Sequence, residues 1–359
     1  MTVLQAEVRR RLWATILEIN LQASLDSGVP LAISYDDFDT DSPGNVNDTD
    51  ISESTNALAC QADNTATDMS LQLLLLKYLR PRAEIIRRTN GAYSNFSQDE
   101  VQSITSILSK ACRECSAKLR SVNGDAVEVF KHNMVDLLLR RFLLTLHRPL
   151  ATASRVSNPT FHFSRKVCLD SATALLSPPQ NTEFSHLVLL GSGIFKSRII
   201  HASLAICSDL IIELEELGPM GWPSTYRKML VGVLREAVRQ AAERIALGET
   251  NLRLHMKLNI VLCHTECTES GSARQLRMVQ AAQESLEKSY TLMQSRLGLA
   301  VGEQYDEGAP ECQQFGCQDL GVALDEDWDE PYDMADIGLD ELLWSGLGAG
   351  GTIVSHEAE

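Results

Sequence analysis

Cysteines at short spacing are the first residues in this sequence that could do chemistry, because such pairs can bind zinc. Three pairs stand close together along the chain: Cys112 and Cys115, Cys263 and Cys267, and Cys312 and Cys317. A structural zinc site needs four ligands. Only the second pair has a histidine nearby. On the expected helix, His264 lies about 100° around the axis from Cys263, so the two side chains face different directions. We therefore predict ordinary thiols, no metal site and no cofactor in this chain.

Acidic residues after the first helix are the second candidate, since carboxylates can hold magnesium. The group superficially resembles the metal motifs of all-α terpene synthases and comprises Asp36, Asp37, Asp39, Asp41, Asn47 and Asp48. Thr40 replaces the last Asp of a DDxxD motif, and Asn56 stands where the second motif needs Glu. Aromatic residues, at 6%, are too few for a carbocation pocket. An all-α magnesium-dependent enzyme thus remains only a remote alternative.

Three single polar residues, His147, His201 and Ser192, are the remaining candidates for catalytic groups. His147 and His201 stand alone in apolar surroundings, where core packing explains them better than catalysis. Ser192, between Gly191 and Gly193, has no G-x-S-x-G context. We find no catalytic residues in the sequence and expect a protein that is not an enzyme.

The charge distribution argues against direct binding of nucleic acid. The net charge is −16, and 16 of the 48 Asp and Glu residues follow Arg296, after which no Lys or Arg occurs. The remaining 32 acids balance the 32 basic residues of the body. Arg9, Arg10 and Arg11 could touch DNA phosphate, but we expect them to pair with acids of the following loop. The sequence shows no basic patch of the kind that binds nucleic acid.

Apolar residues at three- and four-residue spacing predict an all-α body. The first helix begins near Glu7 and stops at Gly28 and Pro30. Its buried stripe is expected to comprise Leu12, Ile16, Ile19 and Ala23, widened by Trp13 and Leu17. A polar loop spans 27–67, and a deeply buried apolar helix that Pro81 kinks or divides follows.

Later helices are bounded by capping and breaking residues. Ser97 and Glu100 form a capping box, and the helix containing Phe142 should end before Pro149. Gly191 and Gly193 should break the apolar region 184–217, and Gly248 should end a later helix. We find no strand pattern and no run of 18 apolar residues, so we expect no membrane span. The body is predicted to be one domain, 1–300, of about eight to ten helices.

In residues 301–359, Gly, Glu, Gln and Asp dominate and apolar residues become fewer. This segment is therefore predicted to be a disordered acidic tail. Within 325–347, acidic residues alternate with large apolar ones, as in activation segments. The candidate activation face comprises Leu339, Leu342, Leu343 and Trp344. A solubilising tail that binds nothing is the alternative.

An ordered set of motifs resembles a known family. RRRLW at 9–13 is followed by LQASLD at 21–26, by G-x-P, and by I-S-x-x-D-F-D-T and N-x-N-D. A second block holds MVDLLLRRFLLTLHRPLA at 134–151 and SRKVCLDSATALL at 164–176. Together they resemble the fungal-specific transcription factor domain, the middle homology region of fungal zinc-cluster regulators. The resemblance covers roughly 7–300, although no single motif is diagnostic.

The resemblance implies a nuclear regulator of RNA polymerase II genes, in which an all-α domain controls activity through a small inducer or a partner. Relatives of this kind often lie beside biosynthetic gene clusters. Co-activator or mediator-type proteins would be partners of the tail. The family's six-cysteine zinc cluster is missing here, so DNA contact and zinc would belong to an absent module.

Two readings of that absence stay open. The chain is either part of a DNA-binding activator or a free-standing interaction protein that acts as co-regulator or antagonist of full-length relatives. The helices that usually precede RRRLW are also missing. The apolar stripe of the first helix, with Trp13, should therefore be partly exposed and cause self-association or association with a relative.

Overall fold

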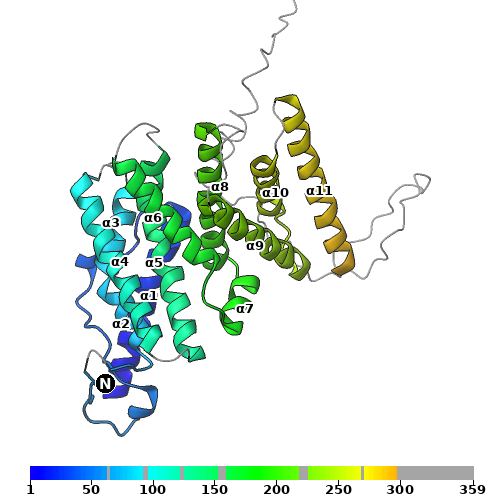
Figure 1. Cartoon of the computed structure of the whole chain (residues 1–359). Coiled ribbons are helices and arrows are strands. Elements are labelled where there is room, and N and C mark those ends of the chain that lie inside the picture. Colours follow the sequence, from blue (N-terminus) through cyan, green and yellow to red (C-terminus); the bar gives the residue numbers. More distant parts are fainter. Residues whose placement is uncertain are drawn as a thin grey trace, which may run out of the picture. The chain divides into compact units, whose positions relative to one another are not determined.

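The computed structural model describes residues 1–62, 65–91, 96–121, 125–152, 159–217, 225–267 and 271–296. These residues form eleven α-helices and two short 3-10 helices, with no strand among them (Figure 1). The all-α prediction is confirmed, and the number of helices slightly exceeds the expected eight to ten. The predicted tail and the domain boundary at 300 lie outside the described residues and stay predictions.

The chain divides into two compact units. The first holds Met1–Asp209 and Thr225–Val233, and the second holds Leu210–Ser224 and Leu234–Glu359. Two helices, α8 (Ile194–Leu217) and α9 (Thr225–Leu247), begin in the first unit and end in the second.

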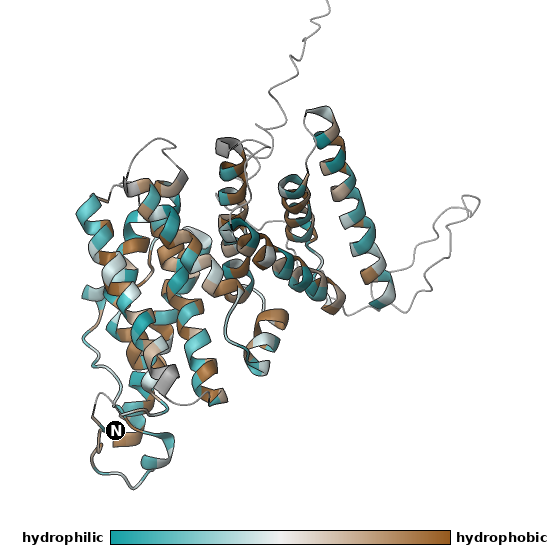
Figure 2. Ribbon diagram, in the orientation of Figure 1, coloured by the Kyte–Doolittle hydropathy of each residue, from teal (hydrophilic) through white to brown (hydrophobic). Residues whose placement is uncertain are grey.

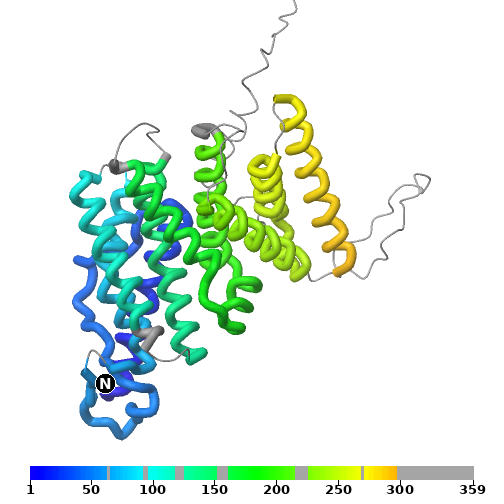
Figure 3. The backbone as a smooth tube through the Cα atoms, in the orientation of Figure 1, coloured from blue at the N-terminus to red at the C-terminus, as the bar shows by residue number. Residues whose placement is uncertain are grey.

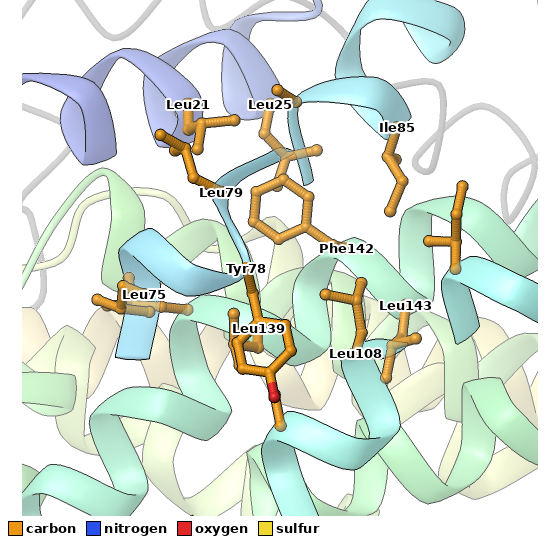
Figure 4. Close-up of a cluster of buried hydrophobic side chains, with 14 of the residues drawn as sticks. Leu21, Leu25, Leu75, Tyr78, Leu79, Ile85, Leu108, Leu139, Phe142 and Leu143 are labelled. Atoms are coloured by element: carbon orange, nitrogen blue, oxygen red, sulfur yellow. The ribbon is translucent and has the colours of Figure 1, made fainter. Parts of the chain in front are cut away.

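Helix α5 (Ala126–Thr152) is the centre of the first unit, because apolar residues surround most of its circumference. It packs against the following helices: α2 (Ser70–Lys77), α3 (Leu79–Thr89), α4 (Gln98–Ser121), α6 (Pro159–Leu176) and α7 (Thr182–Leu190). Phe142 of α5 is fully buried, and Figure 4 shows its ring in a cluster with Leu25 and Leu79. Removing this much apolar surface from water supplies the main driving force for the packing.

Helix α1 (Val3–Ser27) buries a different face from the one predicted. Its core residues are Ala14, Leu17, Leu21 and Leu25, whereas Leu12, Ile16 and Ile19 are exposed. The helix has apolar residues on two opposite faces, so their periodicity could not decide which one packs inward. Only Leu17 of the predicted buried set lies in the core.

Two further predictions about helices were wrong in part. In α2 only Leu75 is buried and the other leucines are half-buried, because α2 covers the core from one side. The chain breaks at Tyr78, and Pro81 lies in the first turn of α3, where its missing N–H costs little. Helix α5 continues past Pro149 to Thr152, since a proline this close to the end removes only one helical hydrogen bond.

The predicted helix boundaries at capping residues are confirmed. Ser97 and Glu100 exchange hydrogen bonds of 2.9 Å and 3.3 Å at the start of α4. Gly193 has φ 53° at the break between α7 and α8, and Gly248 has φ 127° after α9. These positive angles favour glycine, which has no Cβ to clash with the backbone.

The segment between α1 and α2, Gly28–Met69, is held to the body along its described part (Figure 3). It contains two 3-10 helices, Tyr35–Asp37 and Asp48–Asp50. Val46 is 1% exposed, and the buried side chain of Asn45 donates to Ala62 O at 2.8 Å and accepts from Thr67 Oγ1 at 2.6 Å. The predicted polar loop is thus a packed segment, because buried side-chain hydrogen bonds replace those of regular structure.

The second unit contains α10 (Arg253–Glu266) and α11 (Ser272–Arg296), which pack against each other. The ribbon of α11 is mainly hydrophilic, with isolated hydrophobic residues along it (Figure 2). Across the part of the chain that the structure describes, no helix is long and apolar enough to span a bilayer.

Candidate functional site

A row of polar residues on α1 binds arginines from other parts of the first unit. We call this row the α1 polar seam, and it comprises Glu7, Arg11, Glu18, Gln22 and Asp26. The spacing of four or seven residues keeps all five on one side of the helix. The seam separates the buried apolar face of α1 from its exposed apolar face.

Glu7 is the hub at the start of the seam. Its side chain is 1% exposed and accepts hydrogen bonds from Arg10 Nη2 at 2.7 Å, Arg11 Nε at 3.1 Å and the backbone N–H of Gly44 at 3.0 Å. Arg11 also pairs with Asp48. Burial alone would lower the pKa of Arg11, but the hydrogen bonds to Asp48 and Glu7 outweigh it and raise that pKa.

The prediction that the arginine cluster pairs with acids of the following loop is confirmed only for Arg11, which pairs with Asp48, because Arg10 pairs with Glu7 of its own helix. Arg10 and Arg11 are engaged in ion pairs, while Arg9 is exposed and lies 3.4 Å from Met1 Sδ. The hub residue itself was missed by sequence reasoning. Its signal is a glutamate placed three and four residues before two arginines, which is the spacing of helical ion pairs.

Arg82 of α3 is fully buried and occupies the middle of the seam. Its guanidinium binds Glu18 in bidentate fashion at 2.7 Å and 2.8 Å. It also donates to Leu75 O at 2.7 Å and Tyr78 O at 3.2 Å, the carbonyls at the break between α2 and α3. Carbonyls at a helix end lack helical partners, so one arginine both stabilises the break and fastens it to α1.

Arg198 of α8 is the second fully buried arginine, at the C-terminal end of the seam. It pairs with Asp26 at 3.2 Å and donates to Gln22 Oε1 and Ile194 O. Burial lowers its pKa despite the favourable effect of Asp26. A buried guanidinium is stable only when charges and acceptors surround it, so the contact fixes the register between α1 and the start of α8.

The two histidines considered in the sequence are buried and hydrogen-bonded. His147 binds Thr105 Oγ1 through Nε2 at 2.7 Å and Ser164 Oγ through Nδ1 at 3.1 Å, and desolvation lowers its pKa to about 4. His201 Nε2 lies 3.0 Å from Arg141, and burial lowers its pKa well below the usual value. Both fit the predicted structural role, since neither ring reaches solvent.

Three of the residues considered for magnesium form other contacts instead. Asp37 accepts from the backbone N–H of Ser34 at 2.7 Å, Asp48 pairs with Arg11, and Asn47 binds Asp50 at 3.2 Å. No group of three or more potential metal ligands occurs among the described residues. A carboxylate that is already paired with a guanidinium is a poor metal ligand, so the arrangement does not support the terpene-synthase alternative.

Cys112 and Cys115 lie on α4, and Cys263 lies on α10 with Cys267 at its end. Neither pair belongs to a group of three or more potential metal ligands among the described residues. Burial raises the pKa of Cys112 to about 12, whereas Cys115 is partly exposed one turn away. Cys263 donates its thiol to Arg277 O at 3.4 Å. Cys312 and Cys317 lie outside the described residues.

The outward face of α1 is apolar. Val8, Leu12 and Ile19 are each more than half exposed, Ile16 is 37% exposed, and Trp13 is half-buried against Phe38. Partial exposure of this stripe was predicted, and it is found. The candidate activation face at Leu339, Leu342, Leu343 and Trp344 lies outside the described residues.

No protein-family model and no solved structure matches the chain. Curated fungal proteins do. Transcription factor asR3 of Sarocladium schorii is 31% identical in an alignment 348 residues long, which covers 85% of this chain and 41% of that protein. Transcription factor lepE of Aspergillus flavus is 28% identical in an alignment 367 residues long, gaps included, which covers 96% of this chain and 44% of the relative.

Another relative carries a more specific name. The aspyridones cluster regulator apdR of Emericella nidulans is 31% identical in an alignment 268 residues long, which covers 68% of this chain and 36% of that protein. The chain therefore spans about two fifths of the length of these relatives. Its similarity is to fungal transcription factors, and this supports a regulatory role.

Proposed function

We propose that this chain is the regulatory and effector part of a fungal RNA polymerase II transcription factor that controls a biosynthetic gene cluster. The supporting observation is its similarity to a cluster regulator and to two transcription factors over 68% to 96% of its length. The ordered motifs of the body, which resemble those of the fungal-specific transcription factor domain, also support the proposal. In this proposal the protein is nuclear and is not an enzyme.

The fold supports a role in transmitting a signal rather than in chemistry. Fully buried Arg82 and Arg198 join α1 to α3 and α8 through directional contacts. Such contacts hold these helices of the first unit in one defined arrangement. DNA recognition, and any zinc, is assigned to a module outside this sequence, because Arg10 and Arg11 are already bound to Glu7 and Asp48.

The acidic segment 325–347 is the proposed effector. Its acids keep large apolar side chains accessible in water, so that a co-activator or mediator-type protein can bind them as a short amphipathic helix. The contact residues would be Leu339, Leu342, Leu343 and Trp344.

A reporter assay tests this proposal. The whole chain is fused to an unrelated DNA-binding domain, and the four contact residues are changed to Ala together. Strong activation that this variant loses supports the proposal. The matched control changes Leu320, Val322 and Leu324 to Ala in the same tail and should keep its activity. Activation that survives both changes would refute the assigned face, and no activation by the parent chain would refute the effector role.

The second candidate is a free-standing interaction protein that acts as co-regulator or antagonist of longer relatives. The exposed apolar stripe of α1 favours it, because such a surface can bind a homologous chain. Co-expression of the untethered chain with a full-length relative distinguishes the two. Reduced output from the relative's target promoter, restored by Leu12→Glu, would favour the second candidate.

A further inference from the structure

Helix α11 packs on α10 through a face made largely of small and polar residues. Ser285 Oγ and Ser289 Oγ lie 2.7 Å and 3.3 Å from His255 Nδ1, and Met278 Sδ lies 3.3 Å from His264 Nδ1. Met278, Ser285 and Ser289 are the buried residues of this helix. Met278 is the one large apolar residue among these three, whereas Leu276, Val279, Leu286 and Tyr290 remain exposed.

The exposed large apolar side chains of α11 lie in one regular row, which half-buried Met293 continues. We call it the α11 seam, and it comprises Leu276, Val279, Gln283, Leu286, Tyr290 and Met293. The spacing alternates between three and four residues, which is the heptad pattern of two helices that wrap around each other. Leu276, Val279, Leu286 and Tyr290 are between 45% and 63% exposed, and none of the six positions is charged. Isolated apolar residues are common on surfaces, but a row in heptad register indicates an absent helix.

We propose that the α11 seam pairs with the same seam of a second copy of this chain, in parallel orientation. Gln283 identifies the occupant, because a parallel pair places its amide against Gln283 of the second copy. Gln283 Nε2 donates one hydrogen bond to Glu287 at 2.9 Å within α11. The second N–H and the carbonyl oxygen remain to bind the other amide. An unrelated apolar helix would cover this polar group without a partner, which is costly.

The flanks of the seam are compatible with self-pairing. Gln280, Glu287 and Gln294 lie on one side, and Gln275, Ala282 and Ser289 lie on the other, where Ser289 is buried against His255 of α10. In a parallel pair each flank faces the opposite flank of the second copy, so no two like charges meet. A polar residue at a single core position is the feature that fixes register and oligomeric state.

The size of the contact sets its strength. A seam of about two and a half heptads is short for an independent coiled coil, and it would bury on the order of 1,000 Å² in total, the lower end for specific interfaces. Because α10 already holds α11 as a helix, association does not have to form the helix. The dimer is therefore weak and reversible, with an affinity in the micromolar range.

Sedimentation velocity of the full chain over a range of concentrations tests the proposal. The parent chain should shift from monomer to dimer, and Leu286→Glu should raise the dissociation constant at least about tenfold, because it places a charge in the centre of the seam. Thr291→Glu is the matched control: it adds the same charge to the same helix outside the seam and should dimerise like the parent. Far-UV circular dichroism confirms that both variants keep their helices.

Two further variants separate this seam from other modes of association. Leu12→Glu disrupts the exposed stripe of α1 and should leave the dimer intact. Gln283→Cys should form a symmetric disulfide-linked dimer under mild oxidation that the parent chain does not form. A parent chain that stays monomeric at all concentrations, or a dimer lost in Leu12→Glu but not in Leu286→Glu, would overturn the proposal.

Discussion

Glu18→Ala should destabilise the body more than any other single change to a surface carboxylate of α1. The change removes both carboxylate oxygens that accept hydrogen bonds from Arg82. The side chain of Arg82 has no exposed surface, so its charge is left buried without its ion-pair partner. Breaking a buried pair in this way costs about 3–5 kcal/mol. Arg82 keeps its bonds to Leu75 O and Tyr78 O, so we expect the lower end, about 3 kcal/mol.

Urea unfolding followed by far-UV circular dichroism measures this loss. With a slope of about 3 kcal/mol per molar urea, the midpoint should fall by about 1 M. Glu84→Ala is the control, because Glu84 also pairs with arginines of α3 but at the surface, where its removal should cost at most about 1 kcal/mol.

A double variant tests the physical reason. Glu18→Leu with Arg82→Met removes both charges together, and replacement of a whole buried ion pair by apolar residues is often nearly neutral. We therefore expect it to recover more than half of the stability that Glu18→Ala loses. If Glu18→Ala unfolds at the same urea concentration as Glu84→Ala, the contact does not hold α3 to α1 and the argument is refuted.

Three other predictions concern single residues. The pKa of His147 in the folded protein is about 4, below its usual value of 6.5. The unfolded chain therefore binds more protons between these two pH values, and up to about 3 kcal/mol of stability is lost as the pH falls from 6.5 to 4. His147→Gln should flatten this part of a plot of the urea midpoint against pH. Gly232→Ala, at an exposed helical position with free space, should raise the free energy of unfolding by about 1 kcal/mol. Gly28→Ala, at φ 68°, should lower that free energy by about as much, and equal effects of the two changes in urea unfolding would contradict this. Cys60 should be alkylated in the native protein, while buried Cys112 should react only on unfolding, as peptide mapping can show.

The sequence by itself determined the helical class of the body and several of the helix ends. Apolar periodicity predicted the helical body, and Ser97 with Glu100 marked the start of α4. Gly248 marked the end of α9, because a positive φ suits glycine. The pairing of Arg11 with the following loop was also predictable, because a guanidinium close to several carboxylates is attracted to them. These features depend on neighbours along the chain, and their energies are local.

Only the tertiary structure decided which surfaces meet. Helix α1 carries apolar residues on two faces, and the choice of Leu21 over Leu12 for the core depends on the packing of α3 and α5. The burial of Arg82 and Arg198 could not be expected from residue type, because arginine is usually exposed. Their burial requires Glu18 and Asp26, which are 64 and 172 residues away in sequence. Such pairs are specified by the spatial arrangement of helices, which a local pattern does not contain.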